Sequence, residues 1–135
     1  MFILIWLSPT FIKILQDSQH YYIDCTYIST KDYYQLLVIM AYNLLIDAKI
    51  PCTYILLNNK LQNSYEIVLG ILKYIITENN TYKINLISIS IDIEEALANS
   101  VKTVFIDIRH TGCLFHYIKN IRLNMNKIGL FKKYI

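Results

Sequence analysis

The sequence predicts an α/β domain in which a mixed sheet carries helices on its faces. Three observations lead to this class. Hydrophobic residues make up 55% and charged residues 17% of the 135 positions, which excludes a disordered chain and favours a buried sheet. Three strand-like segments follow one another and can pair antiparallel. Strands and helices then alternate, as they do in β-α units.

The N-terminal part of the chain predicts a strand, a helix and then three strands. "FILIWL" indicates a short strand, and Ser8 as N-cap with Pro9 at the first helical position indicates a helix to about Gln19. The next strands are expected in "YYIDCTYIS", "YQLLVIMAYNLL" and "IPCTYILLN". A hairpin turn at "IDAK" would join the last two.

After these strands the hydrophobic period changes to that of a helix. Asn63 or Ser64 is the expected cap, and the apolar positions at helical spacing are Tyr65, Val68, Leu69, Leu72 and Ile76. Then come a strand in "KINLISIS", a helix in "IEEALANSVKTVF", a short strand in "FIDIRHTGC" and a helix in "LFHYIKNIRLNMNKIGL". Three strands followed by β-α units is the element order of the ribonuclease H-like fold, and it predicts a single domain over residues 1–135.

Several function classes lack their sequence signals. The longest apolar runs fall short of the roughly 18 residues that a membrane helix needs, and the start has no basic region typical of a signal peptide. We therefore expect no membrane segment, and Cys25, Cys52 and Cys113 should be reduced thiols. The chain also has no glycine-rich phosphate loop and no nucleophile elbow.

The C-terminal region is basic. Residues 108–135 contain six Lys or Arg and no acid, which suits a polyanion such as DNA. Lys119, Arg122 and Lys127 are the candidate nucleic-acid contacts. A solvated helix face that carries lysines for solubility would explain the same pattern.

Two acids occupy positions where neighbouring strands could bring them together. Asp24 lies within an apolar strand, where an acid is uncommon, and Asp92 lies where the next strand ends and a helix begins. Two close carboxylates would be compensated by Mg²⁺ or Mn²⁺, which prefer oxygen ligands. Asp92 also fits an ordinary N-cap, followed by Glu94 and Glu95 in the first turn, so both roles stay open for it.

Cys113 and His116 form a C-x2-H pair at the start of the last helix. At this spacing both side chains would lie on one helix face and could present two soft ligands. No second Cys/His pair with suitable spacing accompanies them, so we do not expect a structural zinc site. No partner for His20 or His110 can be named from the sequence.

Six segments in order resemble the transposase domain of Mutator-like elements, the MULE family. The segment around Asp24 stands where the family has a D-G-T-[FY] strand, and "GCLFHYIKNI" is similar to its C-x-F-H helix start. The full set is "WLSPTFIKILQDS", "YIDCTYIS", "YYQLLVIMAYN", "IPCTYILLNNKLQNSYEIVLGILK", "ISIDIEEALANSV" and "GCLFHYIKNI". The resemblance covers nearly the whole chain.

This resemblance implies a ribonuclease H-like enzyme that cuts and joins transposon-end DNA, with an Asp-Asp-Glu triad that binds two divalent metals. It makes Asp24 the first acid and Asp92 the second, with Mg²⁺ or Mn²⁺ as cofactor. Cys113 and His116 match the motif that lies near the site in related transposases, where the His contacts DNA phosphate or the scissile region. DNA is the implied partner, the nucleus the implied location, and a homo-oligomer an open possibility.

Two departures from the family pattern limit the expected activity. Cys25 replaces the Gly after the first acid and would add a side chain beside the metal site. No acid follows Asp107, so the final Glu is absent from this sequence, as in a catalytic domain truncated before that residue. We expect a partial domain that does not cleave DNA alone. A non-catalytic nucleic-acid-binding module, or a protein-interaction remnant with exposed apolar surface, is the alternative.

Overall fold

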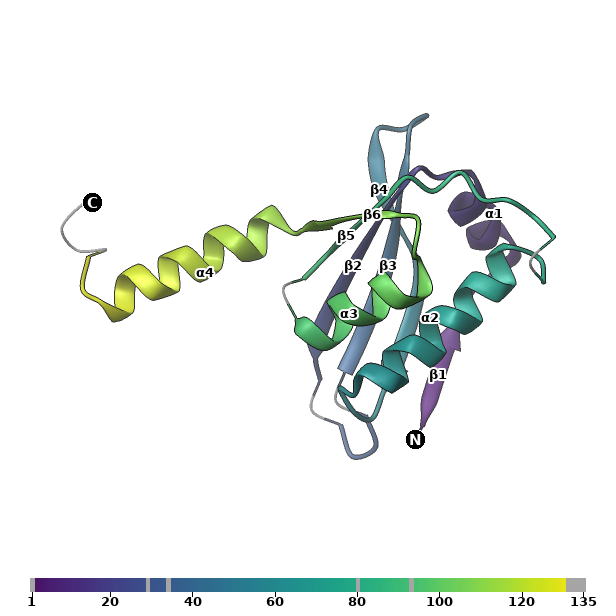
Figure 1. Cartoon of the computed structure of the whole chain (residues 1–135). Coiled ribbons are helices and arrows are strands. Elements are labelled where there is room, and N and C mark those ends of the chain that lie inside the picture. Colours follow the sequence, from purple (N-terminus) through teal and green to yellow (C-terminus); the bar gives the residue numbers. More distant parts are fainter. Residues whose placement is uncertain (1, 29, 34, 80, 93, 131–135) are drawn as a thin grey trace.

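The chain forms one mixed sheet with four helices in a computed structural model that describes residues 2–28, 30–33, 35–79, 81–92 and 94–130 (Figure 1). The strands are β1 Ile3–Trp6, β2 His20–Tyr27, β3 Gln35–Asn43, β4 Ala48–Leu57, β5 Ser88–Ile91 and β6 Arg109–Gly112. The helices are α1 Pro9–Asp17, α2 Gln62–Ile76, α3 Glu95–Val104 and α4 Leu114–Lys127.

The six strands are arranged in the order β1-β4-β3-β2-β5-β6. The pairs β1–β4, β4–β3 and β3–β2 are antiparallel, whereas β2–β5 and β5–β6 are parallel. The predicted α/β class with a mixed sheet is confirmed, including the antiparallel pairing of the three leading strands β2, β3 and β4. The short N-terminal strand β1 extends the sheet beyond β4.

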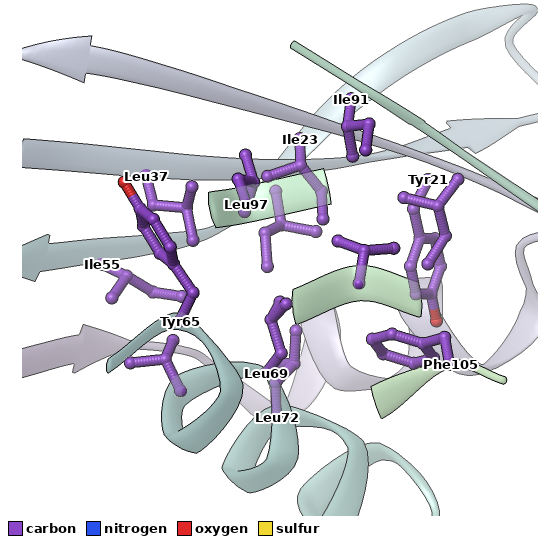
Figure 2. Close-up of a cluster of buried hydrophobic side chains, with 14 of the residues drawn as sticks. Tyr21, Ile23, Leu37, Ile55, Tyr65, Leu69, Leu72, Ile91, Leu97 and Phe105 are labelled. Atoms are coloured by element: carbon purple, nitrogen blue, oxygen red, sulfur yellow. The ribbon is translucent and has the colours of Figure 1, made fainter. Parts of the chain in front are cut away.

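One hydrophobic core lies on one face of the sheet. Alternate residues of the strands face it, and they meet buried side chains of α2 and α3, such as Leu69 and Leu97 (Figure 2). Leu15 of α1 belongs to the same core. The helices that contribute to this core therefore cover a single face. Trp6 and Tyr54, on β1 and β4, remain about half exposed at 52% and 42%. The predicted helical cover is thus confined to the core side in the described residues.

The helix starts agree only partly with the sequence prediction. Ser8 is the N-cap of α1, and its Oγ accepts a hydrogen bond from Phe11 N at 3.3 Å, as predicted. The caps predicted for the next helix are wrong, because α2 begins at Gln62 and its N-cap is Leu61. Asn59 Oδ1 accepts from Leu61 N at 3.0 Å and so fixes the chain before the helix.

The strand predicted at 83–90 is also shorter in the structure. β5 contains only Ser88–Ile91, because the backbone before it bonds to the end of α1 and to the connection between α1 and β2. Ile87 N donates to Gln19 O at 2.8 Å, and Asn85 N donates to Gln16 O at 3.4 Å. These donors are therefore used outside the β-ladder.

The last helix, α4, projects from the sheet (Figure 1). None of its residues is buried, although it carries exposed apolar side chains such as Phe115 at 69% and Ile118 at 41%. α4 therefore adds nothing to the core. Within the described part of the chain, no helix has the length and apolar character needed to cross a membrane.

Candidate metal centre

Asp24 lies on the central strand β2, on the face opposite the core. Its neighbour Ile23 is buried in the core, and successive residues of a strand point to opposite faces. The Asp24 side chain keeps 45% of its surface accessible. This placement avoids the cost of a buried unpaired charge and leaves the carboxylate available to a ligand.

Asp92 follows the parallel strand β5 directly and lies beside Asp24. The register pairs Ile23 with Ile91, and the residue that follows each of them in the chain is an acid. The capping role weighed for Asp92 is wrong, because Glu94 is the N-cap residue of α3. The side chain of Asp92 is 25% accessible.

His116 completes the group from the first turn of α4. Its Nε2 lies 3.8 Å from Asp24 Oδ1, and its Nδ1 lies 3.5 Å from Asp92 Oδ1. One ligand atom from each of the three residues falls within 4.8 Å of the others. We call Asp24, Asp92 and His116 the acid–histidine cluster.

The start of α4 is fixed to the same strand end as Asp92. Cys113 N donates to Ile91 O at 2.8 Å, one residue before Asp92. This bond sets where the helix leaves the sheet, and therefore brings the first-turn residue His116 over the two carboxylates.

The donor chemistry of the acid–histidine cluster fits a divalent cation. Two adjacent carboxylates repel each other and favour a cation between them, and an imidazole nitrogen adds a third ligand. His116 Nδ1 is shielded from solvent, and no hydrogen bond to it is found among the described residues. A metal-bound imidazole uses such a nitrogen as an acceptor toward the ion.

Cys113 does not share a helix face with His116. It is the N-cap residue of α4, with an extended backbone at φ −73° and ψ 119°, and the helix begins after it. The prediction of two soft ligands on one face is therefore wrong, and the possible metal group in the described residues contains His116 without Cys113.

Cys25 lies on the core side of β2, away from Asp24. Its Sγ is 4.0 Å from the hydroxyl of Tyr65, a residue of α2. The expected extra side chain beside the carboxylates is thus directed into the core. Burial raises the pKa of the Cys25 thiol to about 11, so it is neutral at pH 7.

Tyr65 and Glu94 form a polar contact that the sequence pattern did not indicate. The Tyr65 hydroxyl donates to Glu94 Oε1 at 3.0 Å and Oε2 at 3.2 Å. Burial raises the pKa of Tyr65 above its usual value, which keeps the hydroxyl protonated as a donor. Helical spacing predicted Tyr65 as a core residue, and it gave no information on the direction of the hydroxyl.

A hollow of about 260 Å³ adjoins the acid–histidine cluster, with Asp92, Lys102 and His110 in its lining. Burial lowers the pKa of His110, with a further contribution from Lys102, so this imidazole is neutral at pH 7. Lys102 therefore brings a positive charge near Asp92, in a region for which the sequence predicted no site.

The three predicted nucleic-acid contacts are exposed on α4. Lys119 and Arg122 share a hollow with Phe115 and Ile118, whereas Lys127 is not part of that lining. The structure thus brings two of the three cations together with apolar side chains on one side of the helix.

Comparison with known proteins gives one family match. The family model of the MULE transposase domain matches residues 20–120, a range that contains the whole acid–histidine cluster and excludes β1 and α1. No curated protein matches the chain.

Proposed function

This chain belongs to the MULE transposase domain family, and from that membership we propose that it is the metal-binding part of a DNA transposase with a ribonuclease H-like fold. Membership implies a transposase-related function, and divalent metal use and DNA binding in general. The assignment of individual residues to these roles is our proposal.

The strand arrangement supports the ribonuclease H-like assignment. Three antiparallel strands, β4, β3 and β2, are followed by the parallel strands β5 and β6, and the helices α2 and α3 connect them. In such sheets, ligands bind where the carboxyl ends of adjacent parallel strands meet. Asp24 and Asp92 directly follow the last residue pair, Ile23 and Ile91, of the parallel β2–β5 ladder.

The observation that carries the metal proposal is the acid–histidine cluster, with ligand atoms of three residues within 4.8 Å. Asp24 and Asp92 hold the ion through carboxylate oxygens, and His116 contributes a ring nitrogen. An all-oxygen site suits Mg²⁺, whereas an added imidazole suits softer ions, so this donor set favours Mn²⁺ over Mg²⁺.

A divalent cation at such a site supplies charge that stabilises the phosphate and activates water. Asp24 and Asp92 would hold the ion and compensate its charge, and His116 would be its third ligand. Lys102, which lines the same hollow as Asp92, offers a positive charge toward a phosphate group of the DNA.

The 135 residues alone should not cleave DNA. The family resemblance calls for a third acid after the C-x2-H motif, and no acid follows Asp107 in this sequence. With two carboxylates the site compensates less of the charge of two metal ions than three would.

Titration with Mn²⁺, followed by loss of the paramagnetic signal of the free ion, tests the metal proposal. Wild-type protein should bind, and Asp24→Asn should weaken binding more than about tenfold, since loss of an outer partner alone costs about 10–100-fold. Asp17→Asn is the matched control, because Asp17 is an exposed acid that pairs only weakly with Lys13 at 4.0 Å. Equal binding by the two variants would exclude the cluster as the metal site.

The cleavage proposal is tested with purified protein and supercoiled DNA. Neither Mg²⁺ nor Mn²⁺ should produce nicked product. Metal-dependent nicking that disappears in Asp24→Asn would show that the two acids and His116 suffice, and would overturn the proposal.

A second candidate function, nucleic-acid binding without catalysis, is favoured by α4. No residue of this helix is buried, and it carries three cations and no acid. It requires no metal, so it predicts DNA affinity that is unchanged in Asp24→Asn.

A further inference from the structure

Tyr65 contacts the two chain segments that carry the proposed metal ligands. It comes from α2, is fully buried, and lies at one end of the core cluster (Figure 2). Its hydroxyl donates to both carboxylate oxygens of Glu94, at 3.0 and 3.2 Å, and lies 4.0 Å from Cys25 Sγ.

These two partners are close in sequence to the acids. Cys25 directly follows Asp24 on β2, and Glu94 is two residues after Asp92. One hydroxyl on the core side of the sheet thus contacts neighbours of both carboxylates, which lie on the other side.

The contact with Glu94 lies just after the end of the paired part of β5. The pairing of β2 with β5 ends at Ile23 and Ile91, so Asp92 lies beyond the last pair of the ladder. Asp24, in contrast, is still paired with Val38 of β3. Contacts made by the chain after Ile91 therefore contribute to the spacing of the acids.

Glu94 is used for this contact rather than for capping its own helix. It is the N-cap residue of α3, but its side chain makes no capping hydrogen bond. Its carboxylate bonds to Tyr65 instead. The Glu94 carboxylate therefore joins the start of α3 to α2.

We propose that Tyr65 is a positioning residue, whose hydroxyl holds Glu94 and thereby sets the place of Asp92 relative to Asp24 for metal binding. This inference rests on the proposed metal function. Tyr65 does not touch the ion and acts only through the backbone that it anchors.

The test compares Mn²⁺ affinity in Tyr65→Phe, which removes only the hydroxyl, with that of wild-type protein. Affinity should fall roughly tenfold, as for other outer partners of metal ligands. Tyr21→Phe is the matched control, because Tyr21 is equally buried in the same core and its hydroxyl donates to Leu15 O in α1. This control should lose thermal stability to a similar extent and keep wild-type Mn²⁺ affinity.

Two variants of Glu94 separate the hydrogen bond from the charge. Glu94→Gln keeps a carbonyl that accepts from Tyr65 and should retain most of the affinity, whereas Glu94→Ala should lose as much as Tyr65→Phe. The double variant Tyr65→Phe/Glu94→Ala should lose no more than either single variant, because both remove the same interaction.

Amide hydrogen exchange provides a readout that needs no metal. The Ala98 amide donates to Glu94 O at 2.9 Å, and it should exchange faster in Tyr65→Phe and at the wild-type rate in Tyr21→Phe. Unchanged exchange and unchanged Mn²⁺ affinity in Tyr65→Phe would overturn the positioning role. Failure of wild-type protein to bind Mn²⁺ would overturn the metal function, while faster exchange at Ala98 would still support the anchor itself.

Discussion

At the scale of single residues, the alternation of side chains along β2 separates two neighbours into different environments. Asp24 joins the acid–histidine cluster, whereas Cys25 lies against Tyr65 on the core side. The departure from the family's Gly therefore changes the core and not the metal ligands. Alternation is readable from the sequence, but the partner on each face is not, since it comes from distant elements.

The buried thiol of Cys52 gives a prediction about stability and pH. Burial raises its pKa from 9.0 to about 11, so the neutral thiol is favoured in the folded state. The resulting contribution to the free energy of unfolding is fully present below pH 9 and is lost as the pH rises through 11. The loss is on the order of 2 kcal/mol. Urea unfolding at pH 8 and pH 11 measures it.

Other groups also titrate in this range, so the comparison variant is Cys52→Ala. The difference in unfolding free energy between wild-type protein and this variant should shrink as pH rises. A difference that stays constant would mean that the Cys52 thiol ionises in the folded protein as it does in water.

At the scale of elements, the sequence predicted the order and type of the strands and helices, and missed several of their ends. Ser8 and Pro9 mark the start of α1 correctly because a cap acts locally. The start of α3 was missed because Asp is a preferred N-cap residue and Glu is not, so the sequence pattern favoured Asp92. The structure gives the N-cap to Glu94, and the Asp92 carboxylate lies beside His116 of a distant helix.

The expected strand arrangement brought together two of the three residues of the acid–histidine cluster, and only the family resemblance placed His116 near them. The convergence of Asp24 with Asp92 follows from adjacent parallel strands. The place of His116 does not, because it depends on the direction in which α4 leaves β6. That direction is set by the long-range bond from Cys113 N to Ile91 O.

The exposed helix α4 gives a prediction at this scale. Asn124→Pro should break the helix locally, which costs about 3 kcal/mol in a helix interior. Because no residue of α4 is buried, this cost should not reach the sheet. We expect lower helicity by circular dichroism with an unchanged melting temperature.

Asn99→Pro in α3 is the matched control, because α3 contributes Leu97 and Val101 to the core. It should lower the melting temperature strongly. A large loss of thermal stability in Asn124→Pro would mean that α4 packs against the rest of the chain in solution.

At the scale of the whole molecule, the charge is uneven. The net charge is +3, and six of the thirteen Lys and Arg lie in residues 108–135. Replacing Lys119, Arg122 and Lys127 with Ala should therefore weaken DNA binding about equally for all sequences. Each lost phosphate contact reduces the magnitude of the slope of log affinity against log salt concentration by about 0.9. The three replacements should therefore reduce this magnitude by up to about 3.

Removing the same charge elsewhere provides the control. Lys13, Lys60 and Lys83 are exposed and lie before α3, so their triple replacement with Ala should change the salt slope much less. Equal effects of the two triple variants would show that DNA responds to net charge alone. Filter binding or fluorescence anisotropy at several salt concentrations measures both.

Among the described residues, α4 is attached to the sheet through Cys113 at its N-terminal end, so a tilt of the helix would displace its two ends by different amounts. Its 14 residues span about 20 Å at roughly 1.5 Å per residue, and the helix would tilt about Cys113. A tilt of about 10° would move Lys127 by about 3–4 Å, but would move His116, close to Cys113, by less than about 1 Å. In the nucleic-acid-binding role proposed for α4, such a tilt would let Lys127 adjust to a DNA backbone while the imidazole keeps its distance from the two carboxylates.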